Sequence, residues 1–288
     1  MAKIAEIVAN AEKPTFSIEL WPPRTPASAA KLEEALPILE KLHPTFTSIT
    51  YGAGGSTREK THDLVLRIKR QTSIEPMAHL TTAAHRRSEL VTILERYLSA
   101  GIENILALRG DPPLDEGAEL PVGELVHAID LVELARSIGD FSIAVAAHPE
   151  GHPDSPDLVT DRIMLARKLE LADMAITQFF FVADYYFKLV DDLERLGISK
   201  PILPGVMAPT SVKTLERMAH LSGARIPESV RERLYRADQS AETIKEIGVE
   251  IAIELSDELL KRGAPGIHVY TMNEAATTVE IYKGLGLS

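Results

Sequence analysis

Residues suited to proton or ligand chemistry follow an apolar stretch at residues 105–108. Arg109, Gly110 and Asp111 come next, and two prolines follow them. An unbroken apolar run is typical of a strand buried on both faces, and Gly110 would let a ligand approach the backbone between two opposite charges. A strand end closed by a turn with a local ion pair explains this segment equally well.

Similar polar residues recur at the ends of the other predicted strands. A single polar residue at a strand end more often forms a hydrogen bond within its loop than takes part in catalysis. A whole group of such residues, if buried together, needs hydrogen-bond partners. They are Glu19, Thr50, Tyr51, His79, His148, His152, Gln178 and Tyr270, in addition to Arg109 and Asp111.

Glu19 and Asp111 are the two carboxyl groups of this set. Glu19 precedes Trp21 and two prolines, and such an apolar setting is expected to raise its pKa, as a general acid at neutral pH requires. An ionised Asp111 nearby would strengthen that shift. No predicted strand end carries a lysine for Schiff-base chemistry. The scattered His, Asp and Glu residues do not predict a metal site.

Strand and helix patterns alternate along the chain and would position these residues. Roughly eight strand–helix repeats predict a closed (β/α)₈ TIM barrel, an α/β fold, with an extra helix over residues 2–12 and extra helices before the last strand. We expect one catalytic domain over residues 1–288. The alternative is a doubly wound open sheet, but residues 52–55 have only the first two glycines of a dinucleotide fingerprint. The predicted strands cover residues 15–20, 46–50, 75–80, 104–108, 142–147, 174–178, 201–206 and 266–270. The predicted helices cover residues 27–41, 87–100, 124–138, 158–171, 183–196, 211–221, 227–236 and 241–262, with one more capped by Ser56 and another after Asn273.

Composition limits the possible partners and compartments. The net charge of −11 would repel phosphate backbones, so nucleic acid is not an expected partner. The chain has no cysteine, which excludes disulfides and fits a reducing compartment. Residues 1–13 contain Glu6 and Glu12 and no long apolar core, so they predict neither a signal peptide nor a membrane anchor. We expect a cytoplasmic protein without a membrane partner. The sequence is also compatible with a homo-oligomer.

Six ordered motifs resemble those of the methylenetetrahydrofolate reductase family. The resemblance implies a (β/α)₈ barrel that reduces 5,10-methylenetetrahydrofolate to 5-methyltetrahydrofolate with NAD(P)H, NADH being favoured, through a bound FAD. Such an enzyme serves one-carbon metabolism and methionine biosynthesis. The motifs lie at residues 17–24, 50–53, 79–81, 108–111, 147–153 and 175–181.

The resemblance also implies roles for single residues. Glu19 would protonate a folate nitrogen and open the methylene bridge to an iminium ion, while Asp111 would stabilise the developing positive charge. Gln178 and Tyr270 would contact the folate. The implied cofactor-binding residues are Thr50, His79, Arg109, Gly110, His148 and His152, with Asp161, Arg167 and Lys168 reaching the ribose and phosphates of the flavin.

The chain departs from the family pattern at several implied flavin contacts. His148 stands where many members have tyrosine, and Met164 stands where the pattern has asparagine. Residues 121–123 and 170–173 differ as well. Hydride transfer through FAD and direct transfer from the nicotinamide therefore both stay open. Two other functions also stay open: a folate- or nucleotide-binding barrel without catalysis, and a barrel oxidoreductase acting on another pterin. Since Glu274 replaces an arginine, the sequence does not predict how the folate glutamate tail is held.

Overall fold

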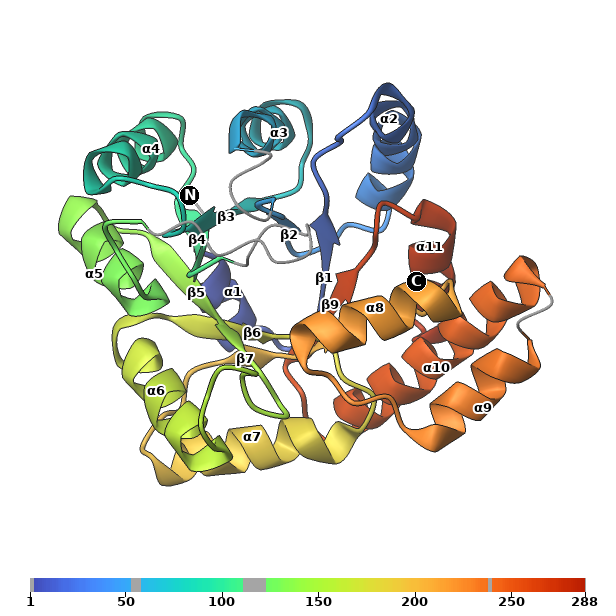
Figure 1. Cartoon of the computed structure of the whole chain (residues 1–288). Helices are drawn as coiled ribbons and strands as arrows, with labels where there is room; N and C mark the ends of the chain where they lie inside the picture. The colour runs from blue at the N-terminus through green and yellow to red at the C-terminus, as the bar shows by residue number, and fades with distance from the viewer. Residues whose placement is uncertain (1–2, 53–57, 111–122, 238–239, 288) are drawn as a thin grey trace.

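Parallel strands form a ring with helices around it (Figure 1). The structure is a computed structural model and describes residues 3–52, 58–110, 123–237 and 240–287. Neighbouring strands follow the order β7-β6-β5-β4-β3-β2-β1-β9-β8, and every pair is parallel. The strands are β1 (Thr15–Leu20), β2 (Thr47–Ile49), β3 (Pro76–Thr81), β4 (Asn104–Leu108), β5 (Ser142–Ala147), β6 (Met174–Thr177), β7 (Ile202–Leu203), β8 (Gly205–Val206) and β9 (Gly266–Tyr270).

Strands β7 and β8 are two halves of the strand predicted over residues 201–206. The first half pairs with β6 and the second with β9, so this one segment bridges both sides of the ring. Pro204 lies between the halves and has no N–H to give to a ladder, but its carbonyl accepts a hydrogen bond from the His268 N–H (2.9 Å). The strands therefore occupy eight positions, and the predicted barrel is confirmed.

The helices follow the predicted alternation with small changes at their ends. The helix predicted from residue 124 begins at Ala128, because the Asp130 carboxylate accepts hydrogen bonds from the N–H groups of Val126 and His127 and fixes the start there. The predicted cap Ser56 lies outside the described residues. The helices are α1 (Ile4–Ala9), α2 (Pro26–Glu40), α3 (Arg58–Gln71), α4 (Arg87–Ser99), α5 (Ala128–Ile138), α6 (Leu158–Leu171), α7 (Ala183–Arg195), α8 (Val212–Ser222), α9 (Glu228–Arg236), α10 (Ala241–Lys261) and α11 (Ala275–Gly284).

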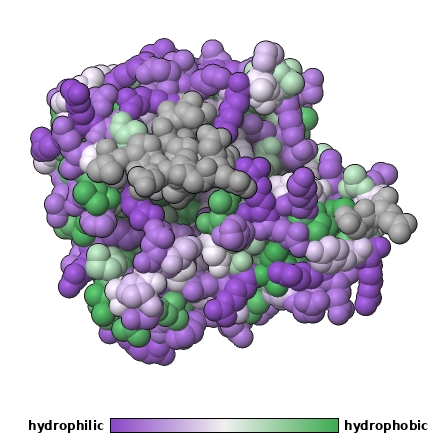
Figure 2. Space-filling view, viewed as in Figure 1, coloured by the Kyte–Doolittle hydropathy of each residue, from purple (hydrophilic) through white to green (hydrophobic). Residues whose placement is uncertain are grey.

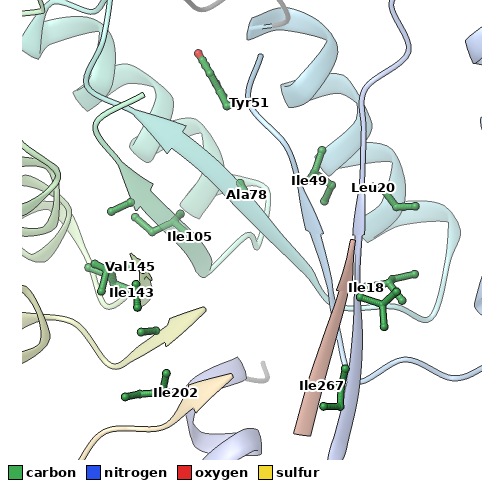
Figure 3. Packing of buried hydrophobic residues seen from close by; sticks show 14 of the residues in the cluster. Ile18, Leu20, Ile49, Tyr51, Ala78, Ile105, Ile143, Val145, Ile202 and Ile267 are labelled. Carbon is green, nitrogen blue, oxygen red and sulfur yellow. The ribbon is translucent and has the colours of Figure 1, made fainter. Parts of the chain in front are cut away.

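The main hydrophobic core lies between the strands and the surrounding helices. Branched side chains such as Ile18, Ile105 and Ile143 are fully buried there, and Figure 3 shows them on separate strands of the ring. Since alternate residues of a strand point to opposite faces, the remaining positions of each strand face the barrel interior.

Helix α1 closes the amino-terminal end of the barrel. Its buried residues Ile4 and Val8 pack against interior side chains that include Phe46 and Met77. The N–H of Ile4 donates to Asn104 Oδ1 (2.9 Å), so a buried strand residue satisfies one of the unpaired donors that begin a helix. Helix α1 thus fills the amino-terminal end of the barrel interior.

Hydrophilic residues cover most of the molecular face in Figure 2. Hydrophobic residues gather at its lower left. The exposed large hydrophobic residues of α6 are Val159, Ile163, Met164 and Leu171. In the described part of the chain, no helix combines the length and apolar character needed to cross a membrane.

Candidate active site

The carboxyl ends of the strands surround a cavity of about 340 Å³. This volume lies within the range of about 300–1,000 Å³ that is usual for small-molecule sites. Asp161 and Arg167 are not among the lining residues, and Asp111 lies outside the described residues. The predicted residues that line the cavity are Glu19, Thr50, Tyr51, His79, Arg109, Gly110, His148, His152, Lys168, Gln178 and Tyr270.

A larger groove of about 610 Å³ lies on the outside of the barrel. Helices α3 and α4 form it, and its lining includes Asp63, Arg67, Arg70 and Arg96. The groove is open to solvent and contains none of the predicted site residues. The barrel cavity is therefore the better candidate site despite its smaller volume.

Glu19 is a buried carboxyl group held by hydrogen bonds from residues that directly follow β1 and β2. Its side chain accepts hydrogen bonds at Oε1 from Trp21 Nε1–H (2.9 Å) and the Thr50 hydroxyl (2.8 Å). Burial raises its pKa from 4.5 to about 7, against the opposing effect of hydrogen bonds from Thr50, Trp21 and Ser48. The predicted rise is confirmed, and a large share of Glu19 carries a proton at neutral pH.

His79 lies beside Glu19 without supplying a positive charge. Its Nε2 is 3.5 Å from Glu19 Oε2, and burial lowers the pKa of His79 to about 3. The imidazole is therefore neutral near pH 7, so this contact does not favour the carboxylate. Within the described residues, His79 Nε2 is buried and has no hydrogen-bond partner, which leaves it available to a ligand.

The raised pKa of Glu19 predicts that the folded protein becomes less stable as pH rises. In the unfolded chain the carboxyl ionises near its model value of 4.5, whereas in the folded chain it ionises near 7. The contribution to stability is thus complete below 4.5 and is lost as pH rises through about 7, for a total of about 3 kcal/mol. Chemical denaturation of Glu19→Gln and the parent chain across this range measures the effect. The variant should gain stability relative to the parent as pH rises, and a constant difference would contradict the assignment.

The opposite wall of the cavity carries the nitrogen-bearing side chains. The rings of His148 and His152 lie 4.6 Å apart, edge to face, and burial lowers the pKa of His148 to about 3. Lys168 Nζ donates to the Ala146 carbonyl (3.0 Å), and burial lowers its pKa as well. Arg109 Nη2 pairs with Asp154 Oδ2 (2.7 Å). Arg109 is thus paired with a carboxylate, whereas the Lys168 ammonium has two further N–H donors for a ligand.

Asp161 stabilises the loop that carries His148 and His152. Its Oδ1 accepts from the N–H of His152 (3.0 Å), and its Oδ2 pairs with Arg162 (2.7 Å). Arg162 also donates to the carbonyls of His148 (2.9 Å) and Pro149 (2.6 Å). The sequence did not predict a role for Arg162, because nothing in the pattern of α6 distinguishes it from an ordinary charged residue of a helix.

Gln178 and Tyr270 form the third side of the cavity. The Gln178 Oε1 accepts a hydrogen bond from the Phe179 N–H (2.9 Å), so the amide NH₂ is the part left to donate to a ligand. The Tyr270 hydroxyl donates to the Thr177 carbonyl (2.6 Å). Gly205 makes room for this ring, since a Cβ there would lie 2.6 Å from a Tyr270 ring carbon.

The described residues fit the ring of a flavin better than its diphosphate. Gly110, His148 and His152, which are expected at the flavin ring, line the cavity of about 340 Å³. Of the three α6 residues expected to reach the ribose and phosphates, Asp161 holds the loop and Arg167 is exposed beside Met164. Of the three, Lys168 alone lines the cavity, and its amine donates to the Ala146 carbonyl. In this structure Asp161 and Arg167 are therefore not among the residues that could contact a diphosphate bound in the cavity. Among the described residues, no cluster of three His, Asp or Glu side chains is arranged to hold a metal ion.

The sequence profile of the family described as methylenetetrahydrofolate reductase matches residues 3–286. The chain belongs to this family. It is 36% identical over 272 residues to the 5,10-methylenetetrahydrofolate reductase of Pectobacterium carotovorum subsp. carotovorum, covering 94% of this chain and 90% of that one. It is also 36% identical over 285 residues to methylenetetrahydrofolate reductase (NADH) 1 of Arabidopsis thaliana, covering 94% of this chain and 48% of the plant protein.

A solved structure supports the fold assignment. An uncharacterized protein from Clostridium thermocellum, which binds two copies of 5-methyl-5,6,7,8-tetrahydrofolic acid, superposes with a TM-score of 0.68. The identity is 16%, and the match covers 99% of this chain and 97% of the other. At this identity the likeness shows a shared fold.

Proposed function

We propose that this protein reduces 5,10-methylenetetrahydrofolate to 5-methyltetrahydrofolate, with NADH as the favoured reductant. Membership of the methylenetetrahydrofolate reductase family supports this reaction, and relatives include forms named for NADH. The observation that carries the mechanism is the buried Glu19, whose pKa of about 7 lets it give up a proton at neutral pH. The proposed catalytic unit is the whole chain, and its proposed place is the cytoplasm, where reduced nicotinamide is available.

Glu19 begins the proposed reaction as a general acid. It gives its proton to N10 of the folate, the bond between N10 and the methylene carbon breaks, and an iminium ion remains at N5. A hydride from C4 of the nicotinamide then adds to the methylene carbon and leaves a methyl group and NAD⁺. The Glu19 carboxylate recovers a proton from solvent. Trp21 and Thr50 hold its Oε1 throughout.

Other residues of the cavity would orient the folate. Gln178 presents its amide NH₂ to the pterin, and Tyr270, fixed by Thr177, lies beside it. Asp111 keeps the role that the family resemblance implies, which is to stabilise positive charge on the iminium.

The proposed hydride route is direct, from the nicotinamide to the iminium. FAD, when bound in a reductase, accepts the hydride from the nicotinamide and passes it on in a second step. No step of the proposed reaction passes through FAD, because Lys168 alone of the three expected α6 contacts lines the cavity. A nicotinamide dinucleotide is a co-substrate that leaves after each turnover, so it needs fewer permanent contacts than a resident cofactor.

An anaerobic assay with methylenetetrahydrofolate tests this proposal. The purified protein should be colourless and should oxidise NADH only when the folate is added, at a rate that added FAD does not change. Initial rates should follow sequential kinetics, because both substrates must be bound together. NADPH in place of NADH serves as the comparison for the reductant.

Two results would contradict parts of the proposal. A yellow protein with ping-pong kinetics would overturn the direct route while leaving the reaction intact. Folate binding without any folate-dependent NADH oxidation would overturn the reaction and favour a binding protein.

A further inference from the structure

The β3–α4 loop, residues 82–86, supports one wall of the cavity from behind. Two of its groups bind the backbone at the end of β4: the Ala83 N–H donates to the Arg109 carbonyl (2.9 Å), and the Thr82 hydroxyl donates to the same oxygen (3.1 Å). Arg109 and Gly110 line the cavity. The position of this wall therefore depends on the position of the loop.

Gly110 lies directly against the loop. Its φ is +97°, in the region that favours glycine, and a Cβ at this position would lie 3.0 Å from the Ala83 Cβ. Because no side chain of Gly110 separates the two segments, a displacement of the loop is passed to the cavity wall.

The loop contains a strained residue. Ala84 has a φ of +58°, in the left-handed region that is unfavourable for a residue with a Cβ. Its carbonyl accepts a hydrogen bond from Arg58 Nη2 (2.9 Å), and Arg58 also pairs with Glu89 near the start of α4 (3.1 Å). Such a backbone conformation persists only where the surrounding contacts hold it. The shape of the loop therefore depends on its neighbours.

His85 makes a further contact of the loop, and its tautomer follows from a backbone carbonyl. Its Nδ1 is 2.7 Å from the Ala83 carbonyl oxygen, which can only accept, so Nδ1 carries a hydrogen. Burial lowers the pKa of His85, against the opposing effect of this hydrogen bond, so the ring is mainly neutral near pH 7 and Nε2 presents a lone pair. The Tyr51 hydroxyl is 3.0 Å from Nε2 and is therefore the donor.

Tyr51 is held from the side of the helices. Figure 3 shows it beyond the end of β2. Its ring meets His62 of α3 edge to face (6.2 Å between centroids), and His62 Nδ1 is 2.5 Å from the hydroxyl of Tyr97 on α4. Tyr51 is thus a fixed point to which its hydroxyl ties His85. His85 is 2% exposed and does not line the cavity, so it reaches a ligand only through the wall.

We propose that His85 is a positioning residue: as the Nδ1–H tautomer it accepts the Tyr51 hydroxyl, ties the β3–α4 loop to this fixed point and so holds the wall at Arg109 and Gly110 in place for the nucleotide co-substrate. The inference deepens the proposed function and depends on it for the identity of the ligand. The tautomer and the tie to Tyr51 are properties of the unliganded protein.

Nitrogen NMR of the unliganded protein tests the tautomer. With labelled histidine, couplings between the ring hydrogens and the two ring nitrogens distinguish a protonated nitrogen from an unprotonated one. At about pH 7, where a neutral imidazole carries one hydrogen, His85 should be protonated at Nδ1 and unprotonated at Nε2. The signals lost in His85→Gln assign the ring. A hydrogen on Nε2 of His85 would overturn the proposal.

NADH binding in His85→Asn and His85→Gln tests the tie. The asparagine amide can still donate to the Ala83 carbonyl but has no group at the position of Nε2. The dissociation constant for NADH should therefore rise about tenfold, the usual cost of leaving a buried hydrogen-bonding group unpaired. Glutamine can place its amide oxygen near the position of Nε2 and accept from Tyr51, so its constant should stay close to that of the parent.

Turnover separates positioning from chemistry. In His85→Asn, KM for NADH should rise while kcat changes little, because Glu19 and its donors Trp21 and Thr50 make no hydrogen bond to the described loop.

Tyr51→Phe removes the same hydrogen bond from its other partner. It should weaken NADH binding as His85→Asn does, and the double variant should show no further loss, because both changes break one interaction. The matched control is His62→Asn. His62 is equally buried in the same cluster but bonds Tyr97, not the loop, so its replacement should lower the free energy of unfolding and leave NADH binding unchanged.

Three binding results would each overturn the positioning role: an unchanged constant in His85→Asn, equal rises in the Asn and Gln variants, or additive losses in the double variant. If these variants behave as expected but the parent does not reduce the folate, the reaction is wrong and the role of His85 stands. If the parent is an active reductase and NADH binding does not respond, the reaction stands and the role is wrong. A parent that binds no NADH, with or without folate, would overturn both. Circular dichroism confirms that the variants compared are folded.

Discussion

Replacing Glu19 by glutamine is expected to lower kcat by about 10²–10⁴-fold, the usual contribution of general acid catalysis. Glutamine has nearly the shape of the acid and can still accept from Trp21 and Thr50, but it has no acidic proton to give. Folate binding should persist because the cavity keeps its shape. Single-turnover NADH oxidation and titration calorimetry measure the two effects separately.

The matched control for this variant is Glu33→Gln. Glu33 is an exposed residue of α2 that pairs with Arg67 outside the barrel, so its replacement should leave kcat unchanged. An undiminished rate in Glu19→Gln would exclude Glu19 as the acid. If the parent chain binds folate but shows no turnover, the protein is a binding barrel without catalysis.

The second large effect is expected from Arg162→Met. This change should lower the free energy of unfolding by about 3–5 kcal/mol, because it leaves the buried Asp161 carboxylate without its cation. Arg162 and Asp161 are 3% and 7% exposed, and the carbonyls of His148 and Pro149 would lose a donor as well. Urea denaturation at neutral pH measures the loss.

Arg167→Met is the control on the same helix. Arg167 is exposed and makes a single long contact with Met164 Sδ (3.9 Å), so its loss should change the free energy of unfolding by less than about 0.5 kcal/mol. Comparable losses in the two variants would show that the Asp161–Arg162 pair does not hold the loop. A higher KM for NADH in Arg167→Met would show that this arginine reaches the co-substrate.

The fold could be predicted because it depends on patterns within short segments. Apolar runs such as residues 105–108 identify strands buried on both faces, and glycines after helices identify where the helices end. The raised pKa of Glu19 was predicted from the apolar residues that follow it along the chain. Its cause is burial in the barrel, and the hydrogen bond from Trp21 opposes it. Asp111 lies outside the described residues and stays a prediction.

The tertiary structure alone decided how distant residues pair. Ser17 and His268 are 251 positions apart, and they meet because β1 and β9 are neighbours in a fixed register. The side chain of Asp161 turns to the loop at His152 instead of the cavity because Arg162 and a backbone N–H hold it there. Local sequence determined the strands, the helices and the acid at a strand end. Strand register and ring closure at Pro204 decided which polar groups form hydrogen bonds with one another. These contacts exist only once the barrel has closed.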